Sequence, residues 1–135
     1  YKVMKSKILQ LLFLMIFFNA SNAQELISND SVQNEIRASL SSFDLPQKVD
    51  ALTTLVAVDT LPVRGIQYIY KLDAEGGNAA ENEQGFRAIK ANLIQQLCNN
   101  PQLIWYKQNF VDMEYLYLDR NESEWFRTRI NANDC

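Results

Sequence analysis

The sequence contains no histidine and only two cysteines, Cys98 and Cys135. Without a histidine or a third thiol, neither a zinc site of the usual ligands nor a Cys–His nucleophile can be assembled. No cysteine stands directly after the apolar N-terminal run, at residues 19–24, so a lipid-anchored lipoprotein is not indicated. We therefore expect no metal, no cofactor and no enzymatic activity.

The first 23 residues have the order of a signal peptide. From Met4, which reads as the start of translation, two lysines precede the apolar run Ile8–Phe18, and Ser21 and Ala23 occupy the small-residue positions of a cleavage site. The run is shorter than the roughly 20 residues that a spanning helix needs. We predict cleavage after Ala23, and the alternative is that the segment is kept as an anchor.

Residues 24–135 are expected to form a single exported domain, periplasmic or secreted. The removed part holds three of the 13 lysines and arginines and none of the 16 acids, so the mature net charge is −6. Because such a domain repels nucleic acid and anionic lipid, we expect no nucleic-acid partner and no stable membrane insertion after cleavage. The length suits one modest core.

The two cysteines of an exported chain are expected to be paired, and only one pairing exists. A disulfide between Cys98 and Cys135 would close a loop of 38 residues counted with both ends. The chain-entropy model values that constraint at roughly 4 kcal/mol.

Hydrophobic spacing predicts an α+β domain with the order α-β-β-α-β-β. Asp30 and Gln33 resemble a capping box at the start of the first helix. The four strands are expected to form a mainly antiparallel sheet with both helices packed on one face. The expected helices cover 32–43 and 86–98, with a short helix at 101–106, and the expected strands cover 49–60, 66–72, 110–119 and 124–131.

The last hairpin can be placed in register by asking which side chains can be buried. Pairing Tyr117 with Phe126 puts the apolar residues of both strands under the helices, whereas a slip by one residue would bury Glu114. The opposite face then pairs Leu118 with Trp125.

That opposite face is the candidate for binding a protein partner. A Trp and arginines on a solvated sheet are the composition of an interaction hot spot. The alternatives are scattered exposed apolar residues, which are common on proteins, or N-terminal residues folding back over the face. The candidate residues are Ile69, Leu116, Leu118, Trp125, Arg127 and Arg129.

One carboxylate pair could in principle carry acid–base chemistry. Asp112 and Glu114 lie two residues apart on a strand and so project from one face. Arg129 is expected opposite Glu114, which makes an ion pair the simpler interpretation.

The C-terminal third resembles a known family. Residues Leu93 to Cys135 contain a helix ending at Cys98, the sequence 99–101 (Asn-Asn-Pro), a Tyr-x-Tyr strand at Tyr115 and Tyr117, an acidic turn at Asp119 and a closing cysteine. Together with the element order, this resembles the α/β class of type II secretion pilotins, small periplasmic proteins that escort a secretin to the outer membrane. The resemblance implies that Cys98 and Cys135 are the family's disulfide pair. It departs at Gln24, where those lipoproteins carry the lipidated cysteine.

These observations predict a non-enzymatic exported binding protein, an accessory factor for secretion or envelope assembly with a pilotin-like fold. The alternative is a small inhibitor or immunity protein that neutralises a secreted enzyme or toxin, because small acidic domains closed by a disulfide suit that task. Neither reading identifies the partner.

Overall fold

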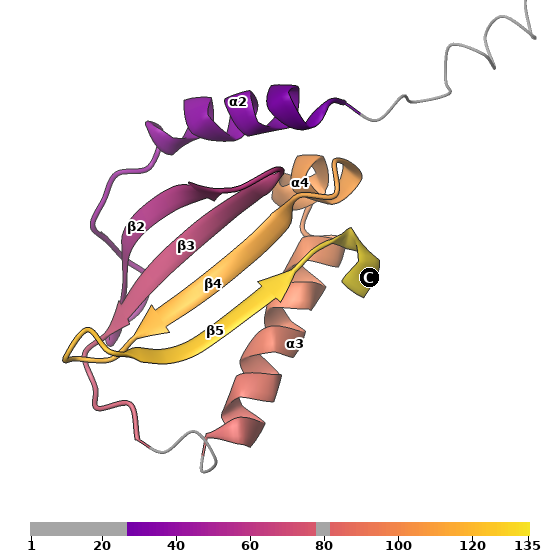
Figure 1. The fold of residues 1–135 in the computed structure, drawn as a ribbon. Helices are drawn as coiled ribbons and strands as arrows, with labels where there is room; N and C mark the ends of the chain where they lie inside the picture. The colour runs from indigo at the N-terminus through magenta and orange to yellow at the C-terminus, as the bar shows by residue number, and fades with distance from the viewer. Residues whose placement is uncertain (1–26, 78–81) are drawn as a thin grey trace, which may run out of the picture.

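A five-stranded sheet runs in the order β1-β2-β3-β4-β5 in the computed structural model, which describes residues 27–77 and 82–135 (Figure 1). β3 and β4 pair in parallel and the other neighbours are antiparallel. The strands are β1 (Gln47–Lys48), β2 (Thr53–Leu61), β3 (Gly65–Leu72), β4 (Asp112–Leu118) and β5 (Glu124–Ile130).

The α+β class is as expected, but a sheet of four mainly antiparallel strands is not what forms. The additional strand, β1, has two residues, which is too short to produce a hydrophobic pattern. β3 and β4 are parallel because α3 and α4 lie between them in the chain and carry it back to the starting end of the sheet. The helical segments are α2 (Asn29–Leu40), α3 (Glu83–Asn99), the 3-10 turn η1 (Pro101–Leu103), α4 (Ile104–Gln108) and η2 (Ala132–Asp134).

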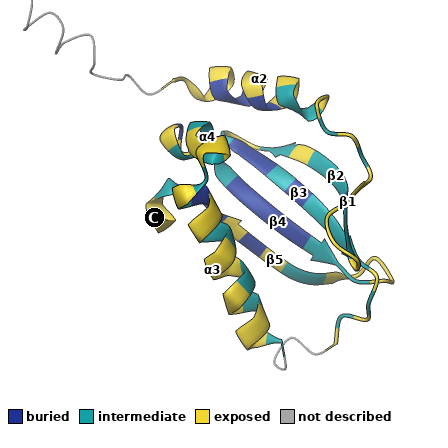
Figure 2. Ribbon diagram, turned by 180° about the vertical axis from the view of Figure 1, so that it is seen from behind, coloured by how far each residue is buried: buried dark blue, intermediate teal, exposed yellow. Residues whose placement is uncertain are grey.

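Both long helices lie on one face of the sheet, as expected (Figure 2). α2 contacts β2 and β3, whereas α3 contacts β5, so each helix covers a different side of that face. Alternate strand residues and one stripe of each helix meet there to form the core. The core consists of Val32, Ile36, Leu55, Ile66, Tyr68, Leu97, Val111, Met113, Tyr115 and Ile130.

The start of α2 differs from the expected capping box. Ser28 is the N-cap, and its Oγ accepts a hydrogen bond from the Ser31 N–H at 3.3 Å. Gln33 is buried instead and joins two strands: its Nε2 donates to the Leu61 carbonyl at 2.5 Å, and its Oε1 accepts from the Gly65 N–H at 3.2 Å. The same side chain that suggested a cap therefore satisfies buried backbone groups at the β2–β3 turn. Asn78 and Glu81, whose spacing ahead of α3 also resembles a capping box, lie outside the described residues.

The end of α3 is tied to the C-terminus. Cys98 and Cys135 form a disulfide with their Cα atoms 5.7 Å apart. The Lys107 Nζ donates to the Cys98 carbonyl at 3.0 Å, near the end of the helix. These links hold α3 and α4 against η2, with which both are in contact.

Four tyrosines form a stacked row across β3 and β4 on the helix-covered face. Tyr68 stacks on Tyr115 with ring centroids 5.2 Å apart, and Tyr70 stacks on Tyr117 at 5.0 Å. The pairs follow directly from the parallel register, which places each tyrosine beside its equivalent. Burial raises the pKa of all four phenols, that of Tyr117 to about 12.

Candidate functional site

The sheet face opposite the helices carries most of the expected partner residues. We call it the open face. It consists of Gln67, Ile69 and Lys71 of β3, Glu114, Leu116 and Leu118 of β4, and Glu124, Arg127 and Arg129 of β5. The parallel pairing of β3 with β4 sets Ile69 beside Leu116. The hairpin sets Leu116 beside Arg127, as the expected pairing of Tyr117 with Phe126 requires.

Glu114 is the centre of the polar half of this face. Its Oε1 accepts from Arg127 at 2.5 Å and from Gln67 Nε2 at 3.0 Å. Its Oε2 accepts from Arg129 at 2.8 Å and 3.2 Å. The Glu114 side chain is 4% exposed, while those of Arg127 and Arg129 are 47% and 53% exposed. The arginines therefore cover the carboxylate and still present charge to solvent.

The electrostatics of Glu114 favour an anchor over an acid. Burial by itself would raise the pKa of the carboxyl. Hydrogen bonds from Arg129 and Gln67, with the charges of Arg127 and Arg129, outweigh burial and hold the pKa below its usual value. A carboxylate kept ionised and fully bonded is a poor proton donor.

Asp112, the other carboxylate of the expected pair, has a separate partner. Asn131 Nδ2 donates to its Oδ1 at 2.9 Å. Each carboxylate of the pair is therefore engaged in its own structural interaction. For Glu114, this is the ion pair with Arg129 that the sequence predicted.

The apolar half of the open face is formed by Ile69, Leu116 and Leu118. Leu116 is 8% exposed although no described helix covers this side, because neighbouring side chains flank it on both strands. Ile69 and Leu118 are half-buried. The result is a short apolar strip beside two arginines, the arrangement in which arginine stems screen apolar surface.

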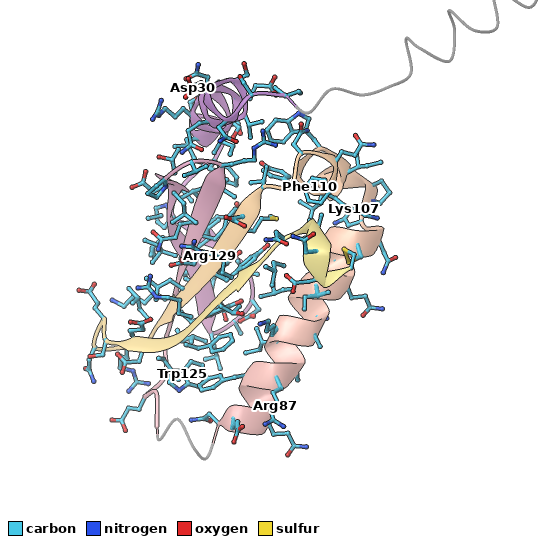
Figure 3. All side chains as sticks on the ribbon, turned by 45° about the vertical axis from the view of Figure 1, so that its right-hand side comes forward. Asp30, Arg87, Lys107, Phe110, Trp125 and Arg129 are labelled. Carbon is cyan, nitrogen blue, oxygen red and sulfur yellow. A yellow bond between two sulfur atoms is a disulfide. The ribbon has the colours of Figure 1, made fainter. Side chains whose placement is uncertain are left out.

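Trp125 does not belong to this face, and its expected pairing with Leu118 is wrong. A bulge between Tyr117 and Leu118 pairs Leu118 with Glu124 instead. A bulge inserts one residue and re-aims its side chain. Trp125 consequently packs on Phe86 of α3, with ring centroids 5.2 Å apart, as Phe126 does at 4.5 Å. Trp125 and the first turns of α3, marked by Arg87, lie together in Figure 3.

The surroundings of Trp125 are close-packed. A Cβ at Gly76 would approach its Cδ1 at 2.8 Å, so glycine is required there for the loop after β3 to pass over the ring. The indole Nε1 is buried and has no hydrogen-bond partner among the described residues. Trp125 therefore packs, half-buried, between β5 and α3 at the edge of the sheet's covered face.

A separate shallow depression lies between α2 and the β2–β3 turn. Its volume is about 700 Å³. It is lined by three amide side chains and one hydroxyl, by one carboxylate, Asp30, and one guanidinium, Arg37, and by three apolar residues at the β2–β3 turn, Leu61, Pro62 and Val63. Within residues 27–77 and 82–135, no three His, Cys, Asp or Glu side chains gather in a way that could hold a metal ion. No helix in that same part of the chain has the length and apolar character to cross a membrane.

Two residues of the hydrogen-bonded network around Glu114 and Arg127 were missed from the sequence. Gln67 donates to Glu114, and Glu124 accepts from Arg127 at 2.6 Å. The contact of Gln67 depends on the parallel pairing of β3 with β4, and that of Glu124 on the bulge, so the sequence contains no local signal for either.

No family model matches the sequence, and no curated protein matches it. Solved structures do match the fold. A protein described as secreted, from Pseudomonas aeruginosa, has a TM-score of 0.67 and 10% identity, and the match covers 83% of this chain and 99% of that one.

Two type II secretion pilotins also share the fold. EpsS of Vibrio vulnificus has a TM-score of 0.58 and 7% identity, over 79% of this chain and 90% of its own. AspS of Vibrio cholerae has a TM-score of 0.57 and 13% identity, over 79% of this chain and 94% of its own. The fold-level resemblance to pilotins is therefore confirmed, and it extends well beyond the C-terminal third.

Proposed function

We propose that this protein is a non-enzymatic exported accessory factor, periplasmic or secreted, that binds another protein during assembly of a secretion or envelope complex. The proposal is supported by the fold shared with two secretion pilotins over most of the chain. The disulfide between Cys98 and Cys135 suits an extracytoplasmic location.

The observation that carries the proposal is the open face. It combines an apolar strip with two half-exposed arginines that are already oriented by Glu114. Arginines held in place lose little side-chain entropy when they bind, which favours their use as interface contacts. We place the partner on Ile69, Leu116 and Leu118, with Arg127 and Arg129 at the rim. Trp125, a candidate from the sequence, is left out because its ring packs on Phe86 of α3.

Photo-crosslinking in cells tests the surface and the class of partner together. A photoreactive residue at Leu118 should give one dominant adduct with a secretion or envelope component. The same residue at Leu52, which is 55% exposed on the β1–β2 loop, is the control and should not give that adduct. An adduct with a secreted enzyme or toxin would support the inhibitor alternative instead. Equal labelling from both positions would show that the open face is not the interface.

A further inference from the structure

Three exposed apolar side chains gather at one end of the sheet, away from the open face. Ile27 is 40% exposed, Val63 is 66% exposed and Phe110 is 46% exposed. They come from three segments: the start of α2, the β2–β3 turn and the α4–β4 connection. Figure 1 shows these segments at the same end of the molecule, and Figure 3 shows Phe110 there. We call these three residues the apolar tip.

Arg64 holds the tip together. Its Nε donates to Asn29 Oδ1 at 2.8 Å and its Nη1 to the Asn109 carbonyl at 2.7 Å, while its Nη2 donates to the Ile27 carbonyl. Its own carbonyl accepts from the Asp112 N–H at 2.9 Å. One guanidinium therefore fixes all three segments, although they are far apart in the sequence.

The backbone at the tip adopts conformations that these residue types avoid. Val63 has φ +72° and Phe110 has φ +49°. A β-branched residue with positive φ is a genuine outlier, and such outliers persist only where surrounding contacts enforce them. At Val63, the Arg64 N–H donates to the Pro62 carbonyl at 3.1 Å, closing a three-residue turn with Val63 at its centre. At both positions a large apolar side chain is exposed to solvent. Glycine or asparagine would adopt the same positive φ more readily.

The chain itself indicates what the tip meets. Ile27 is nine residues from Phe18, the last residue of the apolar run that begins at Ile8. Nine residues span at most about 30 Å. Where that run is kept as an anchor, the alternative to cleavage after Ala23, Ile27 is therefore held within about 30 Å of the bilayer. We propose that the apolar tip docks on the membrane from which the N-terminal segment emerges, inserting Val63 and Phe110 into an uncharged lipid interface.

Lipid fits this surface better than a second copy of the chain or another protein. A stable protein interface buries on the order of 800 Å² on each partner, more than three side chains provide. Shallow insertion of a few apolar side chains is sufficient at a lipid interface when a second attachment is present. Here that attachment is the N-terminal segment in the form of the protein that retains it uncleaved. The acidic balance of residues 24–135 argues for zwitterionic lipid, since anionic lipid would be repelled.

The test uses the full chain, retaining its N-terminal segment, in phosphatidylcholine vesicles. Both described cysteines are in the disulfide, so one introduced thiol can be labelled with an environment-sensitive dye. We expect the dye on Val63→Cys to be quenched by nitroxide-bearing lipid at least twofold more than the dye on Leu52→Cys. Leu52 is similarly exposed and lies beyond the opposite end of β2. Phe110→Cys provides an independent second position if the first variant does not fold.

Each further result decides the proposal. Quenching that survives 0.5 M NaCl supports apolar insertion, and quenching lost in that salt overturns it. Equal quenching at positions 63 and 52 overturns docking by the tip. A change in the dye's emission that disappears when the protein is diluted at constant lipid would show self-association in place of lipid binding. Because the open face is not labelled, these outcomes are independent of the partner proposed above.

Discussion

Replacing Glu114 by glutamine tests whether this carboxylate organises the open face. The variant keeps the shape of the side chain but removes the charge that accepts bonds from Arg127, Arg129 and Gln67. A hydrogen bond to a charged group contributes about 1.5–3 kcal/mol net. Both arginines are about half exposed, so water replaces part of what is lost. We expect Glu114→Gln to lower the free energy of unfolding by roughly 1–2 kcal/mol at pH 7.

The pH dependence of that loss gives the sharper measurement. The folded-state pKa of Glu114 is lowered, so its stabilising contribution is present above the unfolded-state pKa and is lost as pH falls through the folded-state pKa. Urea unfolding at half-unit steps from pH 7 downward should therefore show the difference between wild type and Glu114→Gln held down to the unfolded-state pKa of about 4.3. The two should converge only as the pH falls through the lower folded-state pKa, where wild type becomes neutral as well.

Glu124→Gln is the matched control on the same face. Glu124 bonds only Arg127 among the described residues, and its side chain is 51% exposed. An exposed pair of this kind contributes about 0–1 kcal/mol, so the control should be near wild type. Equal losses in the two variants, or a Glu114→Gln loss that does not change with pH, would refute the account of Glu114 as the buried anchor.

Three other predictions concern a core leucine, the disulfide and a buried tyrosine. Leu97→Ala should cost about 2–5 kcal/mol in chemical denaturation, because the side chain is 1% exposed between α3 and the sheet; a loss below half of one kcal/mol would contradict that packing. Replacing Cys98 and Cys135 by serine should remove about 4 kcal/mol, the value for a 38-residue loop, and an unchanged unfolding midpoint would argue against the bond. The raised pKa of Tyr117, about 12, means that its stabilising contribution is present below pH 10 and falls as pH rises towards 12. Absorbance at 295 nm should show this phenol ionising with unfolding, and ionisation near pH 10 in the folded state would contradict its burial.

The sequence predicts the features of the fold that depend on local pattern. The alternation at 66–72 and the stripe at Phe86–Leu97 identify β3 and α3 because each repeats a single period over several residues. The register of the last hairpin was also accessible, since placing Glu114 among the apolar core residues in place of Tyr115 is too costly, and the pairs from Met113 to Tyr117 are as expected. Glu114 is buried nonetheless, on the opposite face, where Arg127 and Arg129 cover it. Features that depend on the path of the chain in space were not accessible. The parallel pairing of β3 with β4 follows from where the crossover helices place β4, and nothing in either strand encodes it.

Trp125 shows why composition alone misplaces an interaction residue. By simple alternation from Phe126, Trp125 faces solvent beside Leu118, and a Trp between apolar and arginine residues there would resemble a hot spot. One additional residue in β5 turns the indole to the side of Phe86, on which its ring packs edge to face. The open face is left with two arginines oriented by a buried glutamate, while the most exposed apolar residues lie at the ends of the sheet. A partner that uses the open face must therefore recognise fixed charge beside a narrow apolar strip, so salt concentration should affect its association rate more than its dissociation rate.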